Sequence, residues 1–266
     1  YDPLLDFVIH KDYGLPALDN RELRGRLTIA ASYSGNTEET IDGFLEARKR
    51  KLPLIAVATG GTLLALAQKH RVPYIKIPST GIQPRMALGY TVSALLAIIG
   101  NARAIRQAKA LSKSLIPSAR ERAGKALADK LKGYVPVIYA STQNQAIAYN
   151  WKIKFNETGK IPAFWNVVPE LNHNEMTGLD PAPSASSGGA GLRVRAAIKL
   201  SRNFSFIFLR DAEDHPRIQK RMQILAELYR NRDLPVHAIS IVGKGVFQKI
   251  FSSLVLADWT ALYVAK

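Results

Sequence analysis

The chain contains no cysteine among its 266 residues. This absence excludes disulfide bonds, thiolate nucleophiles and cysteine-ligated zinc. The chain also has no uncharged apolar run of about 18 residues, so a transmembrane helix is not expected. Its first residues, YDPLLDFVIHKDYG, lack the charged and then apolar layout of a signal peptide. Together these absences favour a soluble cytoplasmic protein.

Acidic side chains are scarce relative to basic ones. The chain has 21 Asp and Glu against 37 Lys and Arg, which gives a formal net charge of +16. An excess of this size attracts anions and polyanions, so nucleic acid is one candidate partner. The basic residues are scattered, however, at spacings typical of solvated helix faces. We therefore expect a solubilising basic surface; the pattern disfavours nucleic acid as a partner, and no membrane partner is expected.

Short apolar runs rich in β-forming residues alternate with helical patterns in both halves of the chain. The expected strands span residues 26–32, 53–59, 72–78, 134–141, 162–168, 204–210 and 235–242. This alternation predicts an α/β fold with parallel sheets and right-handed crossovers. With an apolar fraction of 47%, a substantial core is available.

The two halves are joined by a long helical stretch. Residues 86–132 are expected to be helical almost throughout, with an interruption near IPSAR at 116–120. We place a domain boundary inside this stretch, so that residues 1–117 and 118–266 form two subdomains of similar architecture. The segment 181–198 is rich in Pro, Ser and Gly, which predicts a flexible surface loop.

The sequence ASYSGNTEET, residues 31–40, follows the first expected strand and opens a helix. Ligands bind at this edge of open α/β sheets, and a helix N-terminus offers backbone N–H groups to an anion. The hydroxyls of Ser32, Ser34 and Thr37 would complete a cradle for a phosphomonoester. An ordinary helix cap, with a capping-box pattern in TEET, is the alternative that these residues leave open. No lysine follows the glycine, so the loop is not a nucleotide-binding P-loop.

Several longer stretches carry a family resemblance. They are SYSGNTEET, ATGGTLLALAQKHRVPYIKIPSTGIQPRMALGY, AYNWKIKFNETGKIPAFWNVVPELNHNEMTG, FIFLRDAEDHPRIQKRM and LADWTALYVAK. In this order they resemble the sugar isomerase (SIS) family, and most closely its bifunctional phosphoglucose/phosphomannose isomerases. The resemblance implies two SIS subdomains, each a parallel sheet flanked by helices. It also implies no metal and no cofactor, and a homodimer whose active sites are shared between subunits.

The implied reaction interconverts glucose 6-phosphate or mannose 6-phosphate with fructose 6-phosphate, a step of glycolysis and gluconeogenesis. Proton transfer between C2 and C1 needs a phosphate anchor, a base, a positive group for the cis-enediolate and a ring-opening acid or base. Ser32, Ser34 and Thr37 match the anchor. Glu175 follows a strand and an Asn-rich turn, and it matches the family's base.

The base has alternatives, and two further groups complete the set. Glu175 could instead be a first-turn helix carboxylate, and Glu170 and His173 are nearby rivals. Arg85, in GIQPRMALGY, matches the family's arginine near the enediolate, although an arginine after proline is usually a solvated turn residue. His215, in DAEDHPRI, matches the ring opener, which in this family comes from the partner subunit; the alternative is a simple helix start.

Two weaker candidates lie near the chain's end. Lys266 matches a family lysine that contacts the sugar ring, and Thr260 is a candidate hydroxyl for handling the mannose epimer. The sequence departs from the family in lacking an N-terminal strand and Gly-Gly-Ser loop before DFVIHKDYGLP, which suggests a truncated chain. Two other functions therefore stay open: a sugar-phosphate-binding SIS regulator, and a catalytically inactive fragment.

Overall fold

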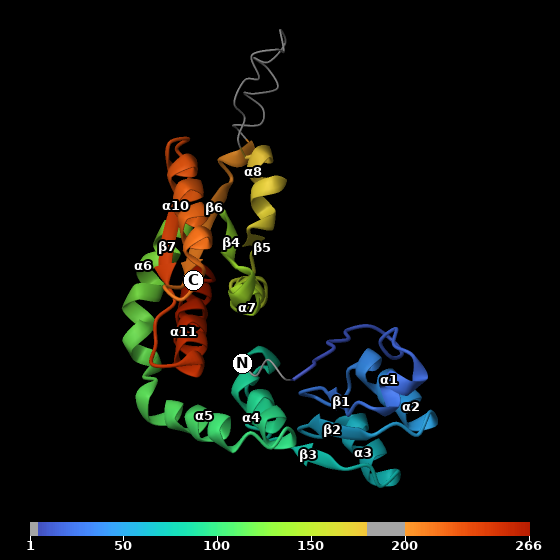
Figure 1. Ribbon diagram of the computed structural model, residues 1–266. Helices are drawn as coiled ribbons and strands as arrows, with labels where there is room; N and C mark the ends of the chain where they lie inside the picture. Colours follow the sequence, from blue (N-terminus) through green and yellow to red (C-terminus); the bar gives the residue numbers. More distant parts are fainter. Residues whose placement is uncertain (1–4, 180–199) are drawn as a thin grey trace. The chain divides into compact units, whose positions relative to one another are not determined.

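The computed structural model describes residues 5–179 and 200–266 (Figure 1). The chain divides into two compact units, Tyr1–Ala110 and Leu111–Lys266. This division falls within the same helical stretch in which the sequence places the boundary near residue 117. The loop predicted at 181–198 lies outside the described residues.

Unit 1 contains a three-stranded parallel sheet with the strand order β1-β2-β3. Its elements are α1 (Asn20–Arg24), β1 (Thr28–Ala31), α2 (Glu38–Lys49), β2 (Leu54–Ala58), α3 (Gly61–Lys69), β3 (Tyr74–Lys76), η1 (Pro84–Met86), α4 (Leu88–Ile98) and α5 (Ala102–Ser114), which continues past Ala110. All three strands expected in this half are present. Their parallel pairing confirms the predicted sheet.

The central strand β2 is buried on both faces, which explains its nearly continuous apolar sequence. Ala56 and Ala58 belong to a cluster that includes Phe44 of α2 and residues of α3. Val57, which points the other way, belongs to a second cluster with Ala94 of α4. Sequence alternation along β2 thus sorts its side chains between two layers of helix.

The long helical stretch is interrupted once more than the sequence analysis expected. Besides the break before α6, the chain leaves the helical conformation between α4 and α5. Gly100 has a φ of 69°, a left-handed conformation that glycine adopts without a Cβ penalty. Asn101 then accepts a hydrogen bond from the Ala104 N–H at 2.9 Å and so starts α5.

Unit 2 contains a four-stranded parallel sheet with the strand order β5-β4-β6-β7. Its elements are η2 (Pro117–Arg120), α6 (Glu121–Leu131), β4 (Val135–Ser141), η3 (Thr142–Asn144), α7 (Gln145–Glu157), β5 (Phe164–Val168), η4 (Glu170–His173), α8 (Glu175–Gly178), β6 (Phe204–Arg210), α10 (Pro216–Arg230), β7 (Val236–Ser240) and α11 (Val246–Val264). The predicted α/β class, with a parallel sheet in each half, is confirmed.

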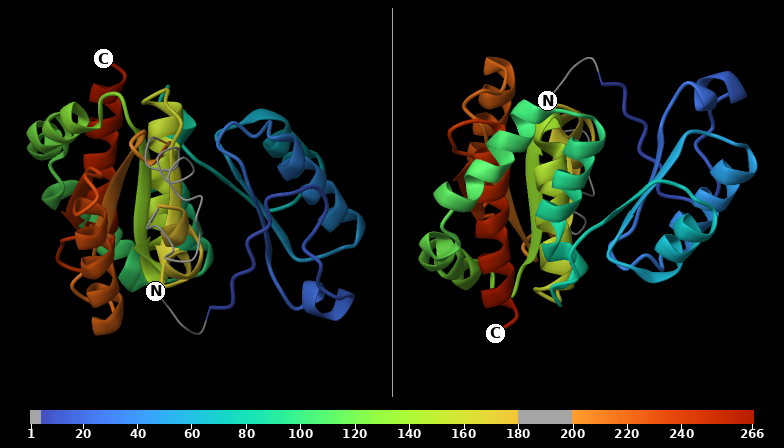
Figure 2. Two further views of the ribbon diagram at one scale, coloured as in Figure 1. Left: turned by 90° about the horizontal axis from the view of Figure 1, so that it is seen from above. Right: turned by 90° about the horizontal axis from the view of Figure 1, so that it is seen from below.

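The strand order of unit 2 reverses direction at its centre. From β4 the chain moves outward to β5, and from β6 it moves outward to β7 in the opposite direction. Right-handed crossovers therefore place α7 and α10 on opposite faces of the sheet, and helices flank the sheet in Figure 2. The point of reversal lies between β4 and β6, and in such sheets ligands bind beside the carboxyl ends of the strands there.

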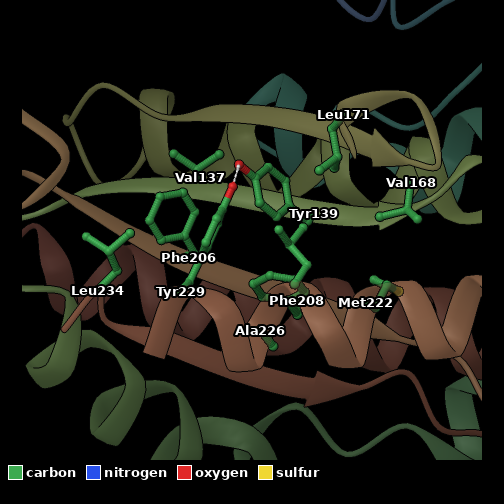
Figure 3. Packing of buried hydrophobic residues seen from close by; sticks show 11 residues of the cluster. Val137, Tyr139, Val168, Leu171, Phe206, Phe208, Met222, Ala226, Tyr229 and Leu234 are labelled. Atoms are coloured by element: carbon green, nitrogen blue, oxygen red, sulfur yellow. Dashed lines mark hydrogen bonds between the residues drawn. The ribbon is translucent and has the colours of Figure 1, made fainter. Parts of the chain in front are cut away.

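A large core cluster lies between this sheet and α10 (Figure 3). It is rich in aromatic rings: Tyr139 of β4 meets the edge of Phe208 at 5.3 Å between centroids, and Phe206 lies 4.6 Å from Tyr229 of α10. Leu171 of η4 is fully buried in the same cluster. The segment that follows β5 is therefore anchored against the sheet.

Helices α7 and α11 are joined by polar contacts as well as apolar ones. The Trp151 indole donates to Ser253 Oγ at 3.0 Å, and the Lys154 ammonium lies 2.5 Å from Asp258.

Within residues 5–179 and 200–266, no helix is long and apolar enough to cross a membrane.

Candidate functional site

The loop between β1 and α2 gathers hydroxyl groups at the carboxyl end of β1. Ser32 Oγ lies 2.7 Å from Thr37 Oγ1 and accepts a hydrogen bond from the Gly35 N–H at 3.1 Å. Ser34 Oγ accepts the Asn36 N–H at 3.2 Å. Ser32 is only 8% exposed, whereas Ser34 lies at the surface. Ser34 thus presents its hydroxyl to solvent, while Ser32 and Thr37 brace the loop.

Close backbone contacts fix the shape of this loop against the start of α3. Gly35 has a φ of 75°, and a Cβ on it would lie 2.0 Å from the Gly60 carbonyl oxygen. Asn36 Oδ1 accepts the Thr62 N–H at 2.9 Å. Only glycine fits at position 35, so the loops after β1 and β2 form one rigid edge.

Thr37 does not cap α2 in the way that an N-cap threonine usually does. Thr37 is the N-cap residue, but its side chain makes no capping hydrogen bond to the first turn. Its hydroxyl turns to Ser32 instead. The first turn of α2 therefore keeps its N–H groups without a side-chain cap, which suits an anion at the positive end of the helix.

Arg85 lies in η1, where Pro84 occupies the first position of the turn. Its side chain is half-buried. The proline fixes the backbone at the start of the turn, so the following guanidinium leaves from a defined position. Arg85, like the hydroxyl loop, belongs to unit 1.

In unit 2, the carboxylate of Glu175 is held at both oxygens. Oε1 accepts the Tyr139 hydroxyl of β4 at 2.5 Å, and Oε2 accepts the Asn166 amide of β5 at 2.5 Å. In the sequence around Glu175, Leu171 and Met176 pack into the apolar cluster between the sheet and α10. Although Glu175 is the first residue of α8, its carboxylate is turned to the strands.

Both phenols near Glu175 stay protonated. Burial, with Tyr229 and Glu175 nearby, raises the pKa of Tyr139 far above its ordinary value. Burial also raises the pKa of Tyr229 to about 12. Tyr139 has one proton, which it donates to Glu175, so its oxygen accepts from the Tyr229 hydroxyl 3.5 Å away. Figure 3 shows the two hydroxyls pointing toward each other.

His215 is exposed and forms the N-cap of α10. Its Nδ1 accepts the Arg217 N–H at 3.1 Å. A ring that accepts at Nδ1 carries its proton on Nε2, so in this position it can donate a hydrogen bond but cannot accept a proton at Nε2. His215 therefore does start a helix, as the alternative interpretation of DAEDHPRI expected. Proton transfer by His215 requires the ring to leave the Arg217 N–H.

A buried polar cluster lies just before α10, at the reversal point between β4 and β6. Asp211 and Asp214 are each 4% exposed, and Asn144 Nδ2 lies 3.4 Å and 3.2 Å from their carboxylates. Lys249 of α11 places its ammonium 2.9 Å from Asp211 and 2.8 Å from Glu213. This cluster fixes the turn that presents His215.

The two aspartates of this cluster differ in acidity. Burial raises the pKa of Asp211, but the Glu213 N–H and the Lys249 ammonium outweigh it and hold the pKa below its usual value. Burial raises the pKa of Asp214, and the charge on Asp211 adds to the effect. One aspartate is thus held charged, and the other resists ionisation.

The weaker candidates belong to α11 and to the end of the chain. Thr260 is fully buried and donates its hydroxyl to the Leu256 carbonyl at 2.8 Å. Lys266 is exposed at the chain's last position, with its ammonium 4.8 Å from the centre of the Tyr263 ring. Both assignments stay predictions.

The rivals to Glu175 are more exposed than it is. Glu170 accepts the Asn174 amide at 3.0 Å, and His173 lies at the surface. Within the described residues, no hydrogen bond joins any two of Glu175, His215, Thr260 and Lys266. In the same residues, no group of three or more His, Asp or Glu side chains is arranged to hold a metal ion.

Comparison with known proteins identifies the family. A family model described as the bacterial phospho-glucose isomerase C-terminal SIS domain matches residues 120–266. A bifunctional phosphoglucose/phosphomannose isomerase of Caldicellulosiruptor bescii is 35% identical over 274 residues, which cover 97% of this chain and 75% of the relative. The chain belongs to the bifunctional phosphoglucose/phosphomannose isomerase family. The resemblance drawn from its motifs is thereby confirmed.

Other members and neighbours agree with this assignment. An isomerase of the same description from Aquifex aeolicus is 30% identical over 263 residues, covering 98% of this chain and 75% of the relative. The tagatose-6-phosphate ketose/aldose isomerase of Escherichia coli shares the fold with a TM-score of 0.60 at 15% identity, over 90% of this chain and 67% of that one. Family membership makes this chain a relative of phosphosugar isomerases on the SIS fold.

Sequence reasoning missed the groups that hold the candidate residues in this family member. Tyr139 carries a hydroxyl into the buried part of β4, and Asn166 stands among apolar residues in β5. A polar residue inside a buried strand needs a hydrogen-bond partner, so both could have been flagged. That Glu175 is the shared partner of both residues could not be predicted, because this pairing depends on strand register.

Proposed function

We propose that this chain is an aldose–ketose isomerase that interconverts glucose 6-phosphate or mannose 6-phosphate with fructose 6-phosphate. Family membership supports a phosphosugar isomerase. The observation that carries the assignment further is Glu175, a carboxylate held by one donor on each oxygen. A carboxylate so held is a defined proton acceptor rather than a mobile surface charge.

The reaction moves two protons and needs no oxidant or reductant. Glu175 takes the proton from C2, and the electron pair of that C–H bond forms a C1–C2 double bond. The C1 carbonyl pair moves onto O1, which gives a cis-enediolate. Glu175 returns its proton to C1 while the O2 proton passes to O1, so that the carbonyl ends at C2.

The remaining groups have distinct roles in this proposal. Ser32, Ser34 and Thr37, with the start of α2, bind the phosphate. Arg85 stabilises the enediolate oxygen with a permanent positive charge. His215 moves the proton that opens the sugar ring.

Two residues complete the proposed set more loosely. Lys266 contacts the sugar ring through its ammonium group. The Thr260 hydroxyl assists the reaction of mannose 6-phosphate. We include both because the family motif LADWTALYVAK carries them.

A coupled assay tests the activity. Glucose 6-phosphate and mannose 6-phosphate are each supplied to the purified chain, and fructose 6-phosphate is measured. In the Glu175→Gln variant kcat should fall by about 10²–10⁴, because the shape is kept and the proton acceptor is lost. Retained turnover would move the base to Glu170 or elsewhere. Binding of both sugars without turnover by the unaltered chain would favour a regulator.

The proposal includes a homodimer in which each active site takes His215 from the partner subunit. A two-fold arrangement repeats this exchange at both sites. When Arg85→Ala and His215→Ala chains are mixed under subunit exchange, each mixed dimer has one site with both changes and one with neither. About a quarter of all sites should then recover. Mixtures as inactive as either parent would place His215 in its own subunit's site.

A further inference from the structure

Two neighbouring strands converge on one carboxylate in unit 2. Tyr139 and Asn166 are register partners in the parallel pair of β4 and β5. Partners in register project from the same face of a sheet. Their hydroxyl and amide groups therefore stand side by side, and each donates to a different oxygen of Glu175 at 2.5 Å.

We infer that Tyr139 and Asn166 are positioning residues, which hold the Glu175 carboxylate in the orientation that proton transfer requires. The inference rests on the proposed role of Glu175 as the base. On each oxygen, one lone pair accepts the hydrogen bond from the donor, and another is left to accept the substrate proton. A carboxylate fixed at two points cannot rotate away from that proton.

The surroundings make this arrangement rigid. Tyr139 is fully buried among aromatic rings, and its ring meets Phe208 edge-on. Asn166 is fixed in turn, since its Oδ1 accepts the Val167 N–H at 2.8 Å. Displacing a base by about 1 Å can lower the rate of a reaction by roughly 100-fold. Two rigid donors are thus suited to keep the Glu175 carboxylate at a fixed position relative to the substrate.

Tyr229 supplies a matched control for Tyr139. Both are fully buried tyrosines of the same cluster, but among the described residues the Tyr229 hydroxyl bonds only to the Tyr139 hydroxyl, at the long distance of 3.5 Å. Replacing either by Phe removes one oxygen and keeps the ring. Only the change at Tyr139 removes a hydrogen bond to Glu175.

The test compares kcat and KM for Tyr139→Phe and Tyr229→Phe in the isomerase assay. Tyr139→Phe should lower kcat by about 10- to 100-fold, the effect of losing one charge-assisted hydrogen bond. KM should stay within about twofold, because the phosphate-binding groups are untouched. Tyr229→Phe should keep nearly the full kcat. A Tyr139→Phe enzyme with unchanged kcat would overturn the inference.

A second measurement separates positioning from a general structural role. Tyr139→Phe is combined with Glu175→Gln, in which the proposed base is already lost. If Tyr139 acts through Glu175, its change should lower the residual rate no further. An equal fall in both backgrounds would show that Tyr139 supports the fold or another group, and would overturn the inference.

Asn166→Asp gives an independent variant of the same shape. It replaces the amide donor with a carboxylate that repels Glu175, so kcat should fall at least as far as in Tyr139→Phe. A full kcat in this variant would contradict the inference. Full activity of Glu175→Gln, by contrast, would refute the proposed base itself, so the two failures are distinguishable.

Discussion

The two strand-to-helix junctions that carry candidate residues contain different kinds of chemical group. At the β1–α2 junction, neutral hydroxyls bond to one another, and Thr37 gives the helix no side-chain cap. At the β6–α10 junction, His215 caps the helix with its own ring, and buried charges fix the turn before it. The first junction leaves its helix N-terminus without a side-chain cap. The second satisfies its helix with the group proposed to move a proton.

In the proposed function, the same topological position therefore serves phosphate binding in one unit and proton transfer in the other. An uncapped N-terminus is favourable for a phosphate, which brings its own oxygen acceptors. A histidine at the N-cap is held in one tautomer until it leaves the helix, so its chemistry is coupled to a local movement. Substitutions at the two junctions test this difference, and they are given in order of decreasing expected effect.

The largest effect is expected at His215, where cap and proton transfer can be separated. Asn is a good N-cap residue, so His215→Asn should keep the melting temperature while turnover of the ring-closed sugar falls by about 10²–10⁴. His215→Ala should lose the same activity and also about 1 kcal/mol of stability. Activity assays and thermal melts of both variants test this. Full turnover by the Asn variant would leave His215 with a capping role alone.

The charged cluster behind His215 should show the next largest effect. Lys249→Met leaves the buried carboxylate of Asp211 without its ammonium partner, which should cost about 3 kcal/mol of unfolding free energy. Lys244→Met, an exposed lysine on the preceding loop, is the matched control and should change stability little. Urea unfolding of the two variants measures the difference. Equal stability would mean that the cluster contributes nothing to this junction.

At the β1–α2 junction the expected change is in substrate binding. Ser34→Ala removes the exposed hydroxyl, so KM for the sugar phosphate should rise by about 10- to 100-fold. Ser93→Ala is the control, because that hydroxyl donates to the Gly89 carbonyl of its own helix at 2.7 Å. Steady-state kinetics with both variants compare the two. An unchanged KM in Ser34→Ala would restore the view that this loop is only a helix start.

The smallest effect is expected from pH and Asp214. Because burial raises the pKa of Asp214, its ionisation destabilises the folded state as pH rises through that pKa. Asp214→Asn cannot ionise, so its melting temperature should gain on the unaltered chain as pH rises from 3 to 7. A gain that is independent of pH would show that hydrogen bonding, not charge, decides the difference.

Much of this architecture could be predicted because burial leaves a clear pattern in the sequence. Strands buried on both faces, such as β2, read as nearly continuous apolar runs, and polar loops mark their carboxyl ends. The positions of the hydroxyl loop and of Glu175 after β1 and β5 could be predicted for the same reason. The break at Gly100 was missed, since a single glycine inside a helical pattern predicts a break only weakly.

The rest depends on geometry that the sequence does not encode locally. Tyr139 and Asn166 become neighbours only through the register of β4 and β5, and a shift by one residue would turn one of them to the other face. The cap bond of His215 depends on the ring's orientation at the start of α10. Neither contact follows from spacing or composition.

Hydrogen exchange at the sugar carbons tests the central claim, that Glu175 is the base of an isomerase, most directly. Glucose 6-phosphate is incubated with the chain in D₂O, and NMR follows deuterium at C2 of the substrate and C1 of fructose 6-phosphate. The unaltered chain should introduce deuterium at these carbons as it turns over, because the proton on the base exchanges with solvent. Glu175→Gln should lose turnover and exchange together. Exchange at the unaltered rate in Glu175→Gln would contradict the account.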